Sequence, residues 1–148
     1  MTATNHGLMG AVIAITLQKY PPLAITVSLL SHFLLDAFPH FGDGKMSLHS
    51  RRFYGILFTD MTLAVVSTLA VAWFWFEIAL LVVGCAFLAA SPDLMWLYYE
   101  YLKPKLKLGR LARFHSRIQW SQSPPGLMVE FIWFIVLFPT LIYIGAQF

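Results

Sequence analysis

The chain has 148 residues, of which 59% are hydrophobic and 11% charged, with a net charge of +3. An ordinary soluble domain has roughly 25% charged residues, so this composition excludes a water-soluble globular fold. A chain of this length forms a single domain, residues 1–148, and its one cysteine, Cys85, excludes an intramolecular disulfide. The composition therefore predicts an all-α integral membrane bundle, because a helix satisfies all of its backbone hydrogen bonds in lipid.

The predicted elements begin with two short apolar segments, 7–18 and 23–38, separated by prolines at positions 21 and 22. Proline breaks a helix because its ring removes a donor and clashes with the preceding turn. The two segments form either a spanning pair or a re-entrant hairpin, and the sequence leaves both open. Three longer segments follow, each with about the 20 residues that a crossing requires: 55–76, 78–98 and 127–146. About five membrane helices are expected.

Basic residues are concentrated in two loops, 39–54 and 99–126. Only Glu77 separates the third helix from the fourth, so these two loops lie on the same side of the bilayer. They contain nine of the ten lysines and arginines, and the positive-inside rule places such loops in the cytoplasm. The sequence therefore predicts a multi-pass protein of the cell membrane with its basic loops cytoplasmic.

Ionisable residues within the predicted helices all fall at the cytoplasmic end of each helix: His6, His32, Asp36, His40, Asp60, Asp93 and Glu130. A charge at membrane depth costs about 2.5–3.5 kcal/mol on insertion scales and usually marks a functional interior. Acids that converge there repel one another unless a cation or protons neutralise them. For any one of these residues, helix capping or snorkelling explains its position as well as a functional role does. Capping gives no reason for such residues to occur at one depth on five helices, so a shared cation explains the whole set better.

His32 and Asp36 give the most specific indication of a metal. They are four residues apart and therefore neighbours on one helix face. An imidazole nitrogen and a carboxylate oxygen directed to a common point suit zinc or another transition-metal ion. His40 continues the four-residue step beyond Pro39. The sequence therefore predicts a divalent metal, most simply zinc, as the cofactor.

The segment 108–120 has the spacing of an amphipathic helix that lies on the cytoplasmic membrane surface. Its apolar residues fall on one face and its arginines on another: Leu111, Phe114 and Ile118 against Arg110, Arg113 and Arg117. At 100° per residue, His115 projects about 40° from Leu111, away from the arginines, and could reach the polar cluster. The arginines either hold anionic head groups or bind a substrate phosphate. The apolar face favours membrane lipid as the partner over nucleic acid.

Four motifs carry a family resemblance: Asn5-His6-Gly7, Ser31-His32-Phe33-Leu34-Leu35-Asp36-Ala37-Phe38-Pro39-His40, Ser91-Pro92-Asp93-Leu94 and Phe114-His115-Ser116-Arg117. In order along the chain they resemble the membrane-bound, metal-dependent hydrolase-like proteins of bacteria and archaea, which are distantly similar to zinc-dependent phospholipases C. The resemblance implies a prokaryotic inner membrane and metal binding by His6, His32, Asp36, Asp93, His115, His40 and Asp60. The chain departs from the family in two segments. The paired aspartates of its Pro-Asp-x-Asp-His segment are missing, and one histidine stands for its His-Arg-x-x-x-His-Ser pattern.

The favoured hypothesis is a metal-dependent hydrolase acting on a phosphoester, with a lipid head group as the expected substrate. A bound Zn²⁺ lowers the pKa of its water to about 7 and stabilises charge on a phosphoryl oxygen. Asp60 or Glu130 would activate the water as catalytic residues. Substrate phosphate would be bound by arginines of the amphipathic segment: Arg110, Arg113 and Arg117.

Two other hypotheses compete with it. The chain could be a non-catalytic scaffold or accessory subunit, in a homo-oligomer or a larger membrane complex, packed through the small residues of segment 84–90. A cation or proton path is the third hypothesis, since buried acids mark transport routes. It is disfavoured because the polar groups all fall in one leaflet.

Overall fold

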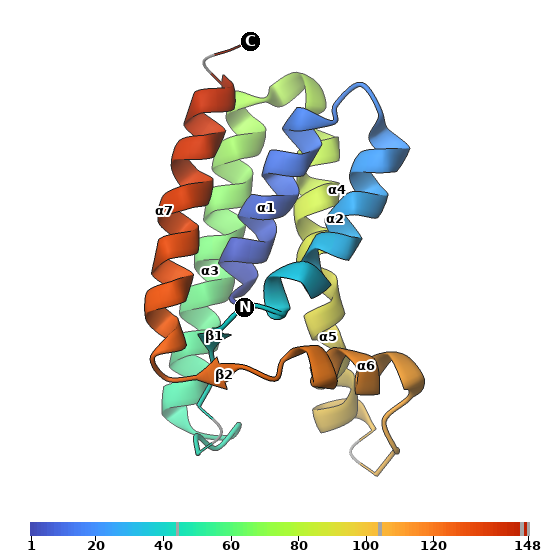
Figure 1. Ribbon diagram of the computed structural model, residues 1–148, viewed down its shortest axis with the longest axis vertical. Coiled ribbons are helices and arrows are strands. Elements are labelled where there is room, and N and C mark those ends of the chain that lie inside the picture. The colour runs from blue at the N-terminus through green and yellow to red at the C-terminus, as the bar shows by residue number, and fades with distance from the viewer. Residues whose placement is uncertain (44, 104, 146, 148) are drawn as a thin grey trace.

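A computed structural model describes residues 1–43, 45–103, 105–145 and 147 of the chain, and its architecture is mainly helical (Figure 1). The α-helices are α1 (Ala3–Thr16), α2 (Pro21–Asp36), α3 (Arg51–Phe74), α4 (Ala79–Ala90), α5 (Leu94–Leu97), α6 (Arg110–Ile118) and α7 (Gly126–Gly145). Three shorter helical turns join them: η1 (Phe76–Ile78), η2 (Ser91–Asp93) and η3 (Tyr98–Leu102). The all-α prediction is confirmed.

Three helical stretches are long and apolar enough to cross a membrane: Arg51–Phe74, Phe76–Leu102 and Gly126–Gly145. They match the three long segments predicted from the sequence, although Ala146, the predicted end of the last one, lies outside the described residues. Large apolar side chains such as Phe58, Trp73 and Leu80 are exposed on them. The outside of the bundle is therefore strongly apolar.

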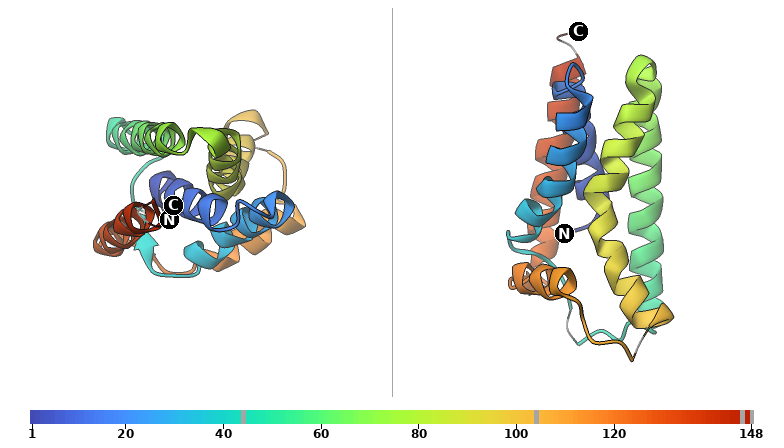
Figure 2. Two further views of the ribbon diagram at one scale, coloured as in Figure 1. Left: turned by 90° about the horizontal axis from the view of Figure 1, so that it is seen from above. Right: turned by 90° about the vertical axis from the view of Figure 1, so that its right-hand side faces the viewer.

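Helix α1 lies at the centre of the bundle and packs against α2, α3, α4 and α7 (Figure 2). It approaches α4 closely because both helices carry small residues there. A Cβ placed on Gly10 would lie 2.5 Å from the carbonyl oxygen of Cys85 and 2.7 Å from the Cα of Ala86. The 14 residues of α1 and the 16 of α2 measure about 21 and 24 Å, less than a hydrocarbon core of about 30 Å.

The end of the bundle that contains the chain's N-terminus is closed by two connecting segments and by α6, which lies across it (Figure 1). Two short strands, β1 (His40–Phe41) and β2 (Gln122–Ser123), pair in parallel, with His40 opposite Gln122. A Cβ on Gly126 would lie 2.0 Å from the carbonyl oxygen of His40, so this contact requires glycine. The sequence did not predict this strand pair. It connects the segment that follows α2 to the one that precedes α7.

Candidate metal centre

Four of the seven residues predicted to bind metal come together at this end of the bundle. His32 and Asp36 lie one turn apart on α2, Asp93 ends the turn η2, and His115 projects from α6. One ligand atom from each lies within 4.8 Å of all the others. The side chains of His32 and Asp36 are fully buried, whereas that of Asp93 is 24% exposed. These residues form a group that could hold a metal ion.

The separations between these ligand atoms suit a tetrahedral ion. The Nε2 atoms of His32 and His115 are 2.9 Å apart, and Oδ2 of Asp36 lies 3.2 and 3.0 Å from them. Oδ1 of Asp93 is farther, at 3.7 Å from His32 and 3.5 Å from His115. Tetrahedral bonds of about 2.0–2.1 Å place neighbouring ligand atoms about 3.3 Å apart. Five of the six separations are therefore 2.9–3.7 Å, close to this value, and all six are within 4.8 Å.

The orientation of the His32 ring is set by the backbone of α4. Its Nδ1 lies 2.8 Å from the carbonyl oxygen of Ala89. Since a carbonyl only accepts, Nδ1 donates and Nε2 presents a lone pair to the centre. In the 3₁₀ pattern of η2, the carbonyl of Ala89 would bond the N–H of residue 92, but Pro92 has none. Pro92 thus favours the tautomer of His32 that metal binding requires.

His6 lies beside the four ligand atoms but contacts a different oxygen of Asp36. Its ring stacks on that of His32, with the centroids 4.1 Å apart. Its Nε2 lies 3.1 Å from Oδ1 of Asp36 and 3.9 Å from Oδ2 of Asp93. The amino group of Met1 also bonds Oδ1 of Asp36. Asp36 therefore has one oxygen directed to the ligand group, while the other accepts hydrogen bonds from His6 of α1 and from the amino group of Met1.

His40, another predicted ligand, is buried but lies outside the group of four. Its Nδ1 donates to the carbonyl oxygen of Phe38 at 2.8 Å, which leaves the lone pair on Nε2. That nitrogen is buried and has no hydrogen-bond partner within the described residues. Burial, and to a smaller extent the positive amino group of Met1, lower the pKa of His40 below its ordinary value. The ring is therefore neutral at physiological pH, with an uncommitted nitrogen.

Asp60 and Glu130, the predicted catalytic carboxylates, accept hydrogen bonds from the first turn of α1. Asp60 binds the backbone N–H and the hydroxyl of Thr4 at 3.0 and 2.7 Å. Glu130 binds the backbone N–H and hydroxyl of Thr2 at 3.0 and 2.9 Å, and the amide of Asn5 at 2.7 Å. A helix N-terminus attracts carboxylates because its first N–H groups lack partners. These two acids hold α1 between α3 and α7.

The helix α6 presents different residues to the bundle and to the outside. Ala112 and His115 are buried, whereas the apolar Leu111 and Phe114 are exposed, as are the predicted substrate ligands of this helix: Arg110, Arg113 and Arg117. At 100° per residue, the arginines project on the opposite side of the helix from His115. The structure does not bring them to the four ligand atoms.

One contact of this centre was missed in the sequence. The side-chain nitrogen of Gln119 lies 3.0 Å from Oδ2 of Asp36 and 3.2 Å from Nε2 of His115. Gln119 follows His115 by four residues, the step that also relates His32 to Asp36. This spacing could have indicated that Gln119 belongs to the site. A glutamine is uncharged, however, so it was not among the ionisable residues from which the site was predicted.

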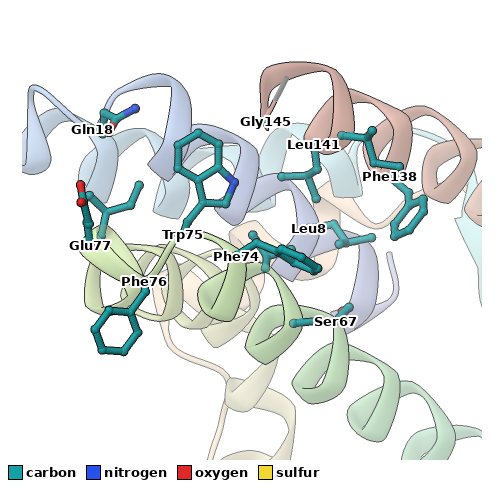
Figure 3. Close-up of a pocket in the computed structure, with 14 residues that line it drawn as sticks. Leu8, Gln18, Ser67, Phe74, Trp75, Phe76, Glu77, Phe138, Leu141 and Gly145 are labelled. Carbon is teal, nitrogen blue, oxygen red and sulfur yellow. The ribbon is translucent and has the colours of Figure 1, made fainter. Parts of the chain in front are cut away.

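A groove of about 860 Å³ lies elsewhere, along α1 and between α3 and α7 (Figure 3). Its walls are mainly apolar, with Leu8, Phe74 and Leu141 among them, and Gln18 and Glu77 lie at one end. Leu8 follows His6 by two residues, a rotation of about 200° on a helix. The groove therefore faces the opposite side of α1 from the metal centre.

Comparison with known proteins yields no match: no protein-family model, no curated protein and no solved structure is similar enough. The function must therefore be inferred from the chain's own residues.

Proposed function

We propose that this protein is a membrane-embedded, zinc-dependent hydrolase that acts on the phosphoester of a lipid head group. The observation that carries the proposal is the group formed by His32, Asp36, Asp93 and His115, whose ligand atoms all lie within 4.8 Å of one another. The family resemblance of the motifs around these residues supports the same reaction class.

In this proposal, lipid surrounds the bundle and the basic loops face the cytoplasm. Support comes from the three long apolar stretches, whose large side chains are exposed, and from the positive-inside rule. The short helices α1 and α2 complete a set of five membrane helices. The exposed arginines of α6 hold anionic head groups at the cytoplasmic surface. Such a topology puts the metal centre within the inner leaflet, where lipid head groups are the nearest phosphoesters.

The bound ion would supply a water of lowered pKa and would stabilise charge on the phosphoryl oxygen. His32, His115 and Asp36 provide the closest ligand atoms, 2.9–3.2 Å apart, and a catalytic zinc typically has three protein ligands. Asp93 is more distant from both histidines and is the most exposed of the four residues. Its carboxylate therefore lines the open side of the centre, where it can accept a proton from water.

Asp93 replaces Asp60 and Glu130 as the proposed proton acceptor. Both of those carboxylates are engaged with the first turn of α1. Neither belongs to the group of four ligand atoms, so neither carboxylate is placed to take a proton from a water bound in the centre.

One observation favours a second candidate, a non-catalytic membrane protein with a structural zinc. If Asp93 ligates as the other three residues do, four protein ligands fill the tetrahedron, as in structural zinc sites. No position for water then remains, and the chain would serve as a scaffold or an accessory subunit.

The test combines elemental analysis with an assay of phosphoester hydrolysis on protein purified in detergent. We expect about one metal ion per chain in the wild type, and its loss in His32→Ala. The matched control is His49→Ala, which removes an exposed histidine and should retain the metal. Phosphate or head-group release from phospholipid vesicles, abolished by His32→Ala, supports the hydrolase. Stoichiometric metal without hydrolysis of lipids or soluble phosphoesters supports the structural zinc, and absence of metal contradicts both.

A further inference from the structure

The side chain of Gln119 lies beside two residues of the proposed ligand set, Asp36 and His115. It caps the C-terminal end of α6, where its backbone N–H donates to the carbonyl of His115 at 3.2 Å. Its side-chain nitrogen is 3.0 Å from Oδ2 of Asp36, the oxygen that faces the two histidines. It is also 3.2 Å from Nε2 of His115. The amide therefore lies along the edge between Asp36 and His115, and the residue is half-buried.

The chemistry of the amide determines what it does there. An amide nitrogen carries two hydrogens and no available lone pair, so it donates to Asp36 and does not itself ligate a metal. The other oxygen of Asp36 is held by His6 at 3.1 Å. Both oxygens of this carboxylate thus have donors outside the ligand set, and its rotation is restricted. Partners of this kind fix the geometry of a metal ligand and tune its affinity.

Gln119 also connects the surface helix to the bundle. Within the described residues, the side-chain hydrogen bonds from α6 and its C-cap to the bundle come from His115 and Gln119. They end on His32 and Asp36. The rest of the outer surface of α6 is exposed. Apolar packing also attaches the helix, since the rings of Phe114 and Phe33 lie 5.6 Å apart. Its polar attachment, however, depends on the same atoms that would bind the metal.

We propose that Gln119 is a positioning residue of the metal centre, which orients Asp36 and couples the attachment of α6 to metal binding. The inference rests on the proposed metal site, but not on the proposed hydrolysis. It assigns to α6 a role beyond the delivery of His115, because the end of this helix determines the direction in which Asp36 presents its ligand oxygen.

The test is titration of the detergent-purified, metal-free protein with Co²⁺, followed by visible absorption. The variants are Gln119→Ala and Gln119→Met. Methionine keeps the length and packing of the side chain but cannot donate. We expect both variants to bind Co²⁺ about 10–100-fold more weakly than the wild type. Their absorption bands should be unchanged, because the ligands are the same.

The control is Ser116→Ala, which alters an exposed residue of the same helix and should bind Co²⁺ like the wild type. Wild-type affinity in Gln119→Met, with weak binding in Gln119→Ala, would show that only packing matters and would overturn the inference. Wild-type affinity in both variants would overturn it equally and leave the proposed metal site intact. If the wild type itself binds no Co²⁺, both the metal site and this inference fail.

Discussion

At the scale of single residues, the candidate site depends on which atom of each side chain is directed to the ligand group. The four-residue step between His32 and Asp36 was sufficient to predict that they share a face. Which nitrogen of His32 carries the lone pair depends on the carbonyl of Ala89, 57 positions away. Such a contact is set by the packing of α2 on α4 and could not be predicted from spacing.

Asp60 provides the clearest test at this scale. In Asp60→Asn, an amide NH₂ replaces one of the oxygens that accept bonds from Thr4 and the neighbouring backbone. We expect a loss of about 1–3 kcal/mol of stability, measured by thermal unfolding in detergent, with the metal content unchanged. Glu77→Gln, at an exposed acid, is the control. Loss of hydrolysis at unaltered stability would instead favour the water-activating role predicted from the sequence.

Among the elements, the long apolar segments were predictable because length and composition alone define them. The prolines correctly separated α1 from α2, but α2 begins at Pro21, two residues before the predicted start at residue 23, because proline is well accommodated in the first turn of a helix. The start of α3 was placed four residues late, because the polar residues Arg51 and Arg52 belong to the helix but not to the apolar run. The pairing of β1 with β2 joins residues about 80 positions apart. No local sequence pattern indicates such a contact, so it could not be predicted.

The close crossing of α1 and α4 leads to a prediction at the element scale. The added methyl group of Gly10→Ala would meet the backbone at Cys85 and Ala86, which cannot move without separating the helices. We expect a destabilisation of about 1–3 kcal/mol, measured by thermal unfolding in detergent. Gly84→Ala is the matched control on α4, since no atom lies within 4 Å of its added Cβ. Equal stability of the two variants would contradict the close crossing.

For the whole molecule, the distribution of basic residues gives a prediction of topology. In a Cys85→Ala background, we place single cysteines at Ser47, Glu77 and Ser116, all of which are exposed positions. A membrane-impermeant maleimide applied to intact cells should label position 77 but not positions 47 and 116, because the proposed topology places the basic loops in the cytoplasm. Inside-out vesicles should give the reverse pattern. Labelling of positions 47 and 77 from the same side would contradict the α3–α4 hairpin as a membrane crossing.

The depth of the candidate metal centre along the bundle has a consequence for how a substrate would reach it. Asp60 lies nine residues after the start of α3 at Arg51, and Asp93 lies nine residues before Leu102, the end of its own span. At 1.5 Å per residue, both carboxylates are about 13 Å inside the ends of these helices. In the proposed orientation the centre thus lies deeper in the bilayer than the ends of these helices, with α6 lying across this end of the bundle (Figure 1). A lipid would have to sink out of the plane of its neighbours to reach Asp93, so the supply of substrate depends on how easily one molecule can leave the leaflet.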